Sequence, residues 1–217
     1  DPGLIVLAPG TPQDAYDLLV EAAELNDPVI MLEHIGLYGL RGGLTGWGQN
    51  INQKVDTKSV NDSIEKKERY KIGKAEVIRG GRDVTLVTWG AMVHVAIQAA
   101  EEMSKQDIEV EIIDIQSLIP FDLQKDISKS VEKTNRLLIV DEDIPGGASA
   151  YILNEILEHQ NIYQNLDSKP QMLTAKEHRP AYGTDGDYFS KPSADDVFES
   201  VYNMFHEVDP SSFPKLR

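Results

Sequence analysis

The feature that most constrains this fold is an alternation of short apolar runs with longer stretches of helical periodicity. The segment DVTLVTWGAMVHVAIQAAEEM, residues 83–103, is one unit: an apolar run with β-branched residues, a turn at Gly90 and a helix. The apolar helix positions follow i, i+3, i+4 spacing and are Met92, Val95, Ala96, Ala99, Ala100 and Met103. Apolar strands that alternate with helices are typical of sheets covered on both faces. We therefore predict a doubly wound, mostly parallel α/β sheet.

The alternation covers most of the chain. We predict strands at residues 4–7, 29–32, 84–88, 109–115, 137–141 and 171–176, and helices at 12–25, 91–104, 122–133, 148–160 and 194–207. Two helix starts are marked locally. Thr11 precedes Pro12 as an N-cap, and Ser193 with Asp196 forms a capping-box pattern.

The rhythm breaks once, between residues 34 and 73. That stretch is first glycine-rich and then polar and charged, which favours a long loop or linker with some mobility. We therefore divide the chain into residues 1–33, the C-terminal end of one α/β unit, the linker 34–73, and an α/β domain at residues 74–217.

Composition excludes several function classes. Acidic residues outnumber basic ones 36 to 21, giving a net charge of −15, which disfavours nucleic acid and favours a basic protein partner. There is no cysteine, so disulfides and thiolate chemistry are excluded, and we expect a cytoplasmic location. No signal peptide or membrane-spanning run is evident, so we expect no membrane contact. The sequence starts without methionine and almost at once in a strand, so we expect a fragment or a processed product.

Candidate site residues follow the predicted strands, because ligands in such sheets bind beyond the carboxyl ends of the strands. They are Glu33-His34, Trp89-Gly90, Ser117-Leu118, Asp141-Glu142-Asp143 and Glu177-His178. The acidic triplet suits Mg²⁺ or a general base, but neighbouring carboxylates converge poorly on one ion, and turn chemistry explains them better. Each Glu–His pair is a candidate acid–base dyad without a recognisable third member.

Other motifs indicate no chemistry. Gly90 stands alone, without a dinucleotide or phosphate-loop pattern, and there is no Gly-x-Ser-x-Gly. His94 lies off the apolar stripe, so we predict a helix surface or interface position rather than catalysis. The residues alone therefore predict a fold but no reaction.

Five stretches in order carry a family resemblance. They are DPGLIVLAPGTPQDAYDLLVEAAELNDPVIMLE, KAEVIRGGRDVTLVTWGAMVHVAIQAAEEM, VEIIDIQSLIPFD, VEKTNRLLIVDED and GGASAYILNEI. The first resembles the end of the pyrimidine-binding domain in beta subunits of 2-oxo acid dehydrogenases, and the others resemble the transketolase-like C-terminal domain of those subunits.

The resemblance implies an enzyme part. The family decarboxylates pyruvate or branched-chain 2-oxo acids with thiamine diphosphate and Mg²⁺, and passes the acyl group to a lipoyl acyltransferase core. The implied partners are an alpha part, separate or fused, a second beta part and the acyltransferase's subunit-binding domain. The family's catalytic histidine and activating glutamate precede the segment that matches residue 1. The resemblance therefore implies no catalytic or cofactor-binding residue here, and inactivity of this chain alone.

Two sites are implied by the resemblance. In some relatives the turn after the first helix binds potassium through backbone carbonyls, which here implies Ala22, Ala23, Leu25 and Asp27; a plain helix end is the alternative. Asp167 matches a position that holds the basic subunit-binding domain, and a solvated loop residue is its alternative. Two other functions stay open for the chain: another transketolase-like enzyme, or a non-catalytic dimerisation or docking module.

Overall fold

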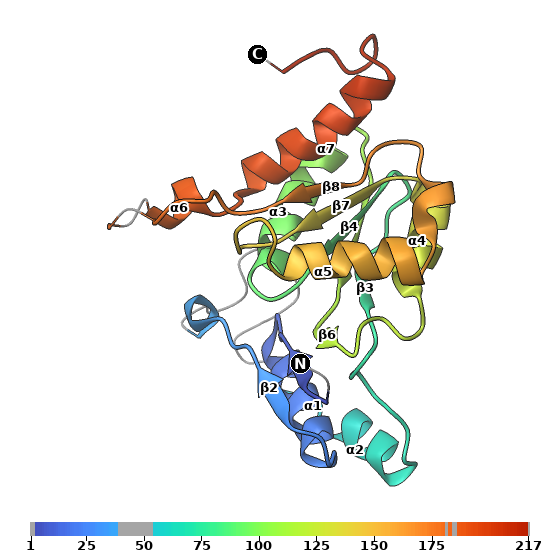
Figure 1. Cartoon of the computed structure of the whole chain (residues 1–217), viewed down its shortest axis with the longest axis vertical. Helices are drawn as coiled ribbons and strands as arrows, with labels where there is room; N and C mark the ends of the chain where they lie inside the picture. The colour runs from blue at the N-terminus through green and yellow to red at the C-terminus, as the bar shows by residue number, and fades with distance from the viewer. Residues whose placement is uncertain (1–2, 39–53, 181, 184–185, 217) are drawn as a thin grey trace.

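The computed structural model describes residues 3–38, 54–180, 182–183 and 186–216. Its two sheets have the strand orders β3-β5-β4-β7-β8 and β2-β1-β6 (Figure 1). The strands are β1 (Ile5–Leu7), β2 (Val29–Met31), β3 (Glu76–Arg79), β4 (Val84–Thr88), β5 (Val110–Asp114), β6 (Ser117–Ile119), β7 (Leu137–Val140) and β8 (Gln171–Leu173). The α-helices are α1 (Pro12–Ala23), α2 (Lys58–Glu65), α3 (Met92–Ser104), α4 (Asp126–Thr134), α5 (Ala148–Asn154), α6 (Gly186–Ser190) and α7 (Ala194–Val208).

The five-stranded sheet is the doubly wound sheet that the sequence predicts. Strands β4, β5, β7 and β8 run parallel, and β3 joins the edge antiparallel to β5. Helices α3 and α7 pack on one face, and α4 and α5 on the other. Every residue of β4, β5 and β7 is buried, because each face of these strands is covered. The predicted fold class is confirmed.

The smaller sheet joins distant parts of the chain. Strand β1 pairs in parallel with β2 and antiparallel with β6, which follows β5 in the sequence. Ile5, Leu7 and Leu18 form its small core with Ile72. The first residues of the chain therefore complete their sheet with a strand from beyond residue 110.

The structure adds elements that the periodicity did not indicate. Helix α2 and the 3₁₀ turn Ile35–Leu37 lie in the predicted linker, whose glycine-rich residues 39–53 fall outside the described residues. Helix α2 has only Val60 buried, and β3 is half exposed, so neither has a strong apolar pattern. The helix predicted at 148–160 ends as α5 at Asn154 and continues as a π-helical turn, Glu155–His159.

Both predicted helix starts are present. The Thr11 hydroxyl accepts a hydrogen bond from the Asp14 N–H at 3.1 Å, and Ser193 forms a reciprocal capping box with Asp196. The cap bonds satisfy N–H groups that have no partner within the helix.

His94 is buried at an interface within the chain. Its Nε2 donates to the Gly10 carbonyl at 2.9 Å, which ties α3 to the turn before α1. A Cβ at Gly10 would lie 3.2 Å from Asp114 Oδ2 and 3.3 Å from the Gly90 carbonyl, so this contact is close. The interface interpretation of His94 is right, and the surface alternative is wrong.

Helix α1 buries an unusually acidic face. Its buried residues are Asp14, Asp17, Leu18 and Glu21. The Glu21 carboxylate accepts from the backbone N–H groups of Tyr70, Lys71 and Ile72 at 3.0, 2.7 and 3.0 Å. The end of the predicted linker is therefore fixed to α1 by three charge-assisted hydrogen bonds.

One lysine enters the same acidic face. Lys71 Nζ lies 2.5 Å from Asp14 Oδ1 and 3.0 Å from Glu76 Oε2. Burial alone would lower the pKa of Lys71, but its pairing with Asp14 and then Glu76 raises it overall. We call the contact between α1, residues 70–76 and the end of β5 at Asp114 the acidic junction.

Candidate functional site

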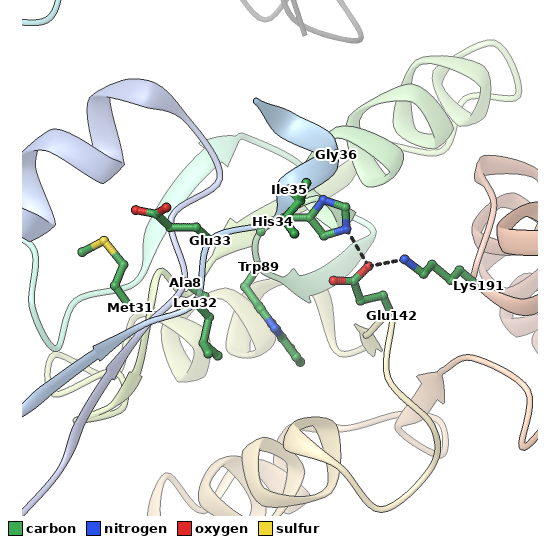
Figure 2. A pocket seen from close by; sticks show the side chains of 11 residues that line it. Ala8, Met31, Leu32, Glu33, His34, Ile35, Gly36, Trp89, Glu142 and Lys191 are labelled. Carbon is green, nitrogen blue, oxygen red and sulfur yellow. Dashed lines mark hydrogen bonds and ion pairs between the residues drawn. The ribbon is translucent and has the colours of Figure 1, made fainter. Parts of the chain in front are cut away.

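A cleft of about 560 Å³ lies where strands of the two sheets end (Figure 2). Its walls come from residues that follow β1, β2, β4 and β7, and from the segment before α7. Met31, Leu32 and Trp89 supply apolar surface. The cleft is thus at the carboxyl ends of parallel strands, where the sequence places candidate site residues.

Three polar side chains meet in this cleft. Glu142 Oε2 accepts from His34 Nε2 at 3.0 Å and from Lys191 Nζ at 3.1 Å (Figure 2). About a third of each side chain is exposed. A carboxylate between an imidazole and an ammonium holds both donors in fixed directions, and a partly exposed imidazole can exchange a proton with a bound ligand.

Local geometry explains why His34 faces Glu142. A Cβ at Gly36 would lie 2.9 Å from His34 Cε1, so a side chain there would push the ring from this position. Glu33 accepts instead from the Tyr38 hydroxyl, and this hydrogen bond raises the pKa of Tyr38. The predicted pairing of Glu33 with His34 is therefore wrong. The carboxylate that contacts His34 belongs to Glu142, at the end of β7.

The three acidic residues at the end of β7, Asp141 to Asp143, have different roles. Asp141 is buried, and its two oxygens accept from the N–H groups of Asp143 and Ser149 at 3.0 and 3.1 Å. Burial raises the pKa of Asp141, and these backbone bonds oppose the rise. Across the described residues no three His, Cys, Asp or Glu side chains are placed to hold a metal ion. Asp141 thus fixes the turn into α5, which agrees with the turn interpretation.

Two other strand-end candidates lie outside the cleft. His178 is exposed and its Nδ1 lies 3.0 Å from the Arg179 carbonyl, without the neighbouring glutamate as a partner. Ser117 donates its hydroxyl to the Pro120 carbonyl at 2.7 Å. Both have local structural roles in this fold.

The four residues implied for potassium lie at the end of α1. The Ala22 carbonyl accepts from the Leu25 N–H at 3.1 Å, and Ala23 and Asp27 are exposed. A carbonyl has a second lone pair, and the last carbonyls of a helix carry its negative end. The potassium site stays a prediction.

Asp167 has a partner within the chain. Its Oδ2 lies 3.1 Å from Arg136 Nη2, and 45% of the Asp167 side chain is exposed. The Arg136 guanidinium also stacks 4.7 Å above the ring centre of Phe205 on α7. Asp167 is accessible to solvent but already forms an ion pair with Arg136, and its docking role stays a prediction.

Lys191 is the site residue that sequence reasoning missed. It follows the short helix α6, which shows no helical periodicity long enough to detect. The strand ends that supply His34, Trp89 and Glu142 were all candidates, but only the folded chain shows that they meet.

Comparison with known proteins then identifies the class. The fold and the strand-end cleft define an α/β domain of the doubly wound kind, and the family model "Transketolase, C-terminal domain" matches residues 73–191. The chain belongs to the transketolase C-terminal domain family. A split-gene transketolase, described as an inactive beta4 tetramer, superposes with a TM-score of 0.63 at 19% identity over 93% of this chain and 57% of that one.

Curated relatives are beta subunits. The chain is 40% identical over 144 residues to the beta subunit of acetoin:2,6-dichlorophenolindophenol oxidoreductase of Cupriavidus necator, covering 66% of this chain and 37% of the relative. It is 37% identical to the pyruvate dehydrogenase E1 component subunit beta of Bacillus subtilis, with 71% and 42% covered. The corresponding subunit of Mesostigma viride is 33% identical, with 92% and 55% covered. The resemblance to these beta subunits is confirmed, and the chain spans 37 to 55% of their length.

Proposed function

We propose that this chain is the C-terminal portion of the beta part of a thiamine diphosphate-dependent 2-oxo acid dehydrogenase. In the complete enzyme it would take part in oxidative decarboxylation of pyruvate or a branched-chain 2-oxo acid, with acyl transfer to lipoamide. The observation that carries the proposal is the 33% identity to a pyruvate dehydrogenase beta subunit over 92% of this chain.

Within that enzyme, the chain would serve assembly and docking. An alpha part and a second beta part would complete the enzyme, and a basic subunit-binding domain of the acyltransferase would bind near Asp167. The net charge of −15 supports a basic partner. Potassium at Ala22, Ala23, Leu25 and Asp27 would brace the turn between α1 and β2.

The chemistry with thiamine diphosphate and Mg²⁺ belongs to the complete enzyme. Among the described residues, no three His, Cys, Asp or Glu side chains are grouped to hold a metal ion. We therefore assign them no step on the cofactor. None of the described helices has the length and apolarity to cross a membrane.

A second candidate function is oxidation of acetoin. The 40% identity to an acetoin oxidoreductase beta subunit favours it, although that match covers less of the chain than the pyruvate dehydrogenase match of Mesostigma viride. The two candidates share a beta-subunit scaffold and differ in substrate.

The experiment is affinity purification of the native protein from its host, followed by assay with thiamine diphosphate, Mg²⁺ and 2,6-dichlorophenolindophenol as electron acceptor. Turnover of pyruvate or a branched-chain 2-oxo acid, with an alpha part and a lipoyl acyltransferase in the preparation, is the expected result. Turnover of acetoin alone would favour the second candidate. Ketol transfer between sugar phosphates with neither activity would contradict both.

A simpler measurement tests whether the cofactor site lies outside this chain. Calorimetry of the 217-residue chain with thiamine diphosphate and Mg²⁺ should show no measurable binding. Micromolar affinity in this measurement would overturn the assignment of the cofactor site to other parts of the enzyme.

A further inference from the structure

The acidic junction gathers more buried carboxyl groups than it has cations. Asp14, Asp17 and Asp114 are 4, 1 and 0% exposed. Among the described residues, Lys71 is the ammonium in ion-pair range of this cluster, and its Nζ lies 3.9 Å from Asp17 Oδ2. An unpaired buried carboxylate is costly, and one route to relief is to keep a proton.

Two carboxyl oxygens in the cluster have no hydrogen-bond partner. Within the described part of the chain, Asp17 Oδ2 and Asp114 Oδ2 are buried and accept no hydrogen bond, although Lys71 Nζ lies 3.9 Å from the Asp17 oxygen. Burial raises the pKa of Asp114 well above its ordinary value; the Asp14 carboxylate adds to the rise, and Lys71 opposes it. Burial also raises the pKa of Asp17, against the hydrogen bond from Gln13 and the charge of Lys71. Charge and geometry both favour a protonated carboxyl here.

Charged groups of every neighbouring element face this cluster. They are Asp14 and Glu21 of α1, Asp56 before α2, Lys71 and Glu76 on the segment that enters β3, and His94 of α3, which holds the Gly10 turn beside Asp114. A cleft of about 250 Å³ is lined by Lys71, Glu76 and the buried Gln116 among others, so solvent reaches the two charged groups that face the cluster from residues 70–76.

We propose that the acidic junction is a proton-linked clamp, which holds α1 against residues 70–76 and β5 while a proton stays among its buried carboxyls and loosens when rising pH removes it. The clamp acts between the two sheets, because α1 belongs to the β1–β2 unit and Asp114 ends a central strand of the larger sheet. Its action is independent of which substrate the complete enzyme takes.

The direction of the pH dependence follows from the shifts. A carboxyl whose pKa is raised on folding stabilises the fold fully at a pH below its pKa in the unfolded chain, which is 3.8 for Asp17 and Asp114. This contribution is lost as the pH rises through the pKa of the folded state. The pKa of Glu76 is lowered, because Lys71 outweighs its burial, so its contribution is lost only as pH falls below 4.5. The Lys71 contribution is lost only above 10.5. The clamp should therefore be tightest in mild acid and loosen towards alkaline pH.

Amide hydrogen exchange measures whether the clamp is closed. The amides of Tyr70, Lys71 and Ile72 donate to Glu21, and they should lose protection when α1 separates from this segment. Protection factors, which remove the intrinsic pH dependence of exchange, should fall as the pH is raised from mild acid to the alkaline range. The amides of β7 should change much less.

Variants separate the clamp from general pH effects. Asp114→Asn mimics the protonated carboxyl and should flatten the profile, and Asp17→Asn should flatten it in part. Glu101→Gln removes one negative charge at an exposed position of α3 and should leave the pH profile of protection as in the wild type. Folded Asp114→Asn and Asp17→Asn proteins with the wild-type profile would overturn the proposal. A flat or rising wild-type profile, or equal loss in β7, would also overturn it, whether or not a variant folds.

Discussion

The five-stranded sheet and the acidic junction are both buried, but they are held by different forces. The sheet buries an almost continuous set of Val, Leu and Ile side chains on its two faces. The junction buries three carboxylates of one helix against Lys71 and three backbone N–H groups. Apolar burial is non-directional and tolerates rearrangement, whereas a buried ion set is favourable only while every member is present.

This difference predicts opposite sensitivities. The sheet should respond to changes in side-chain volume and hardly to pH. The junction should respond to the loss of a single charge and to the state of protonation of its neighbours. The substitutions below test that contrast, in order of expected effect.

Replacing Lys71 should have the largest effect. Lys71→Met keeps the aliphatic stem but leaves Asp14 and Asp17 without their cation, and loss of one partner from a buried ion set costs about 3–5 kcal/mol. Urea unfolding at pH 7 measures the change. Lys105→Met, at an exposed ion pair with Glu102, is the matched control and should cost under about 1 kcal/mol. Equal costs at both lysines would remove the distinction between the regions.

Truncation in the sheet core comes next. Leu138 is fully buried in β7, and Leu138→Ala should cost about 2–5 kcal/mol through lost burial and the cavity that remains. Leu123→Ala, at a side chain that is 60% exposed, should cost much less. The Leu138 effect should be the same at pH 5 and pH 8. A strong pH dependence here would contradict the comparison.

Glu21→Gln should have a smaller, local effect. The glutamine amide keeps one acceptor oxygen, but it lacks the negative carboxylate that accepts hydrogen bonds from the Tyr70, Lys71 and Ile72 N–H groups. We therefore expect the free energy of unfolding to fall by about 1–3 kcal/mol. Denaturant unfolding gives the total, and limited proteolysis shows whether cleavage near residues 66–72 increases. Glu24→Gln, exposed one turn of α1 away, should change neither. Unaltered cleavage in Glu21→Gln would mean that these bonds do not anchor the segment.

The smallest effect on stability is expected at Asp167. Its ion pair with Arg136 is partly exposed, so Asp167→Asn should cost under about 1 kcal/mol of folding free energy. Binding of the acyltransferase's subunit-binding domain should weaken more, by roughly five- to a hundredfold at low salt, and the difference should shrink at high salt.

The binding measurement needs a matched surface change. Glu158→Gln, exposed on the neighbouring turn, should leave the affinity unchanged. Equal affinities of wild type and Asp167→Asn at low salt, with both proteins folded, would remove Asp167 from the docking face.

The sequence predicts the sheet well because its physical pattern is local. The runs that became β4, β5 and β7 are rich in Val, Leu and Ile, and the α3 stripe buries Met92, Ala96 and Met103 as its spacing predicts. Strands β3 and β6 escaped detection because each has only two apolar residues in a row: β3 reads EVIR and β6 reads SLI.

The junction and the cleft lay beyond local reasoning. On α1, Asp14, Asp17 and Glu21 follow helical spacing, but carboxylates at that spacing normally mark a solvated face. Their burial depends on Lys71, some fifty residues away in the sequence. Glu142 likewise meets His34 across 108 residues. Side chains whose partners are distant carry no signal in a single window of sequence.

The pairing of β1 with β6 has a consequence for the order of events during synthesis. At roughly 5–20 residues per second, β1 leaves the ribosome on the order of ten seconds before the Ser117–Ile119 strand that completes its sheet. During that interval the apolar edge of β1 is open to other strands, which is a risk for mispairing. Strands β7 and β8 of the larger sheet leave the ribosome later still. We therefore expect the smaller sheet to gain its last strand while the larger sheet is still incomplete.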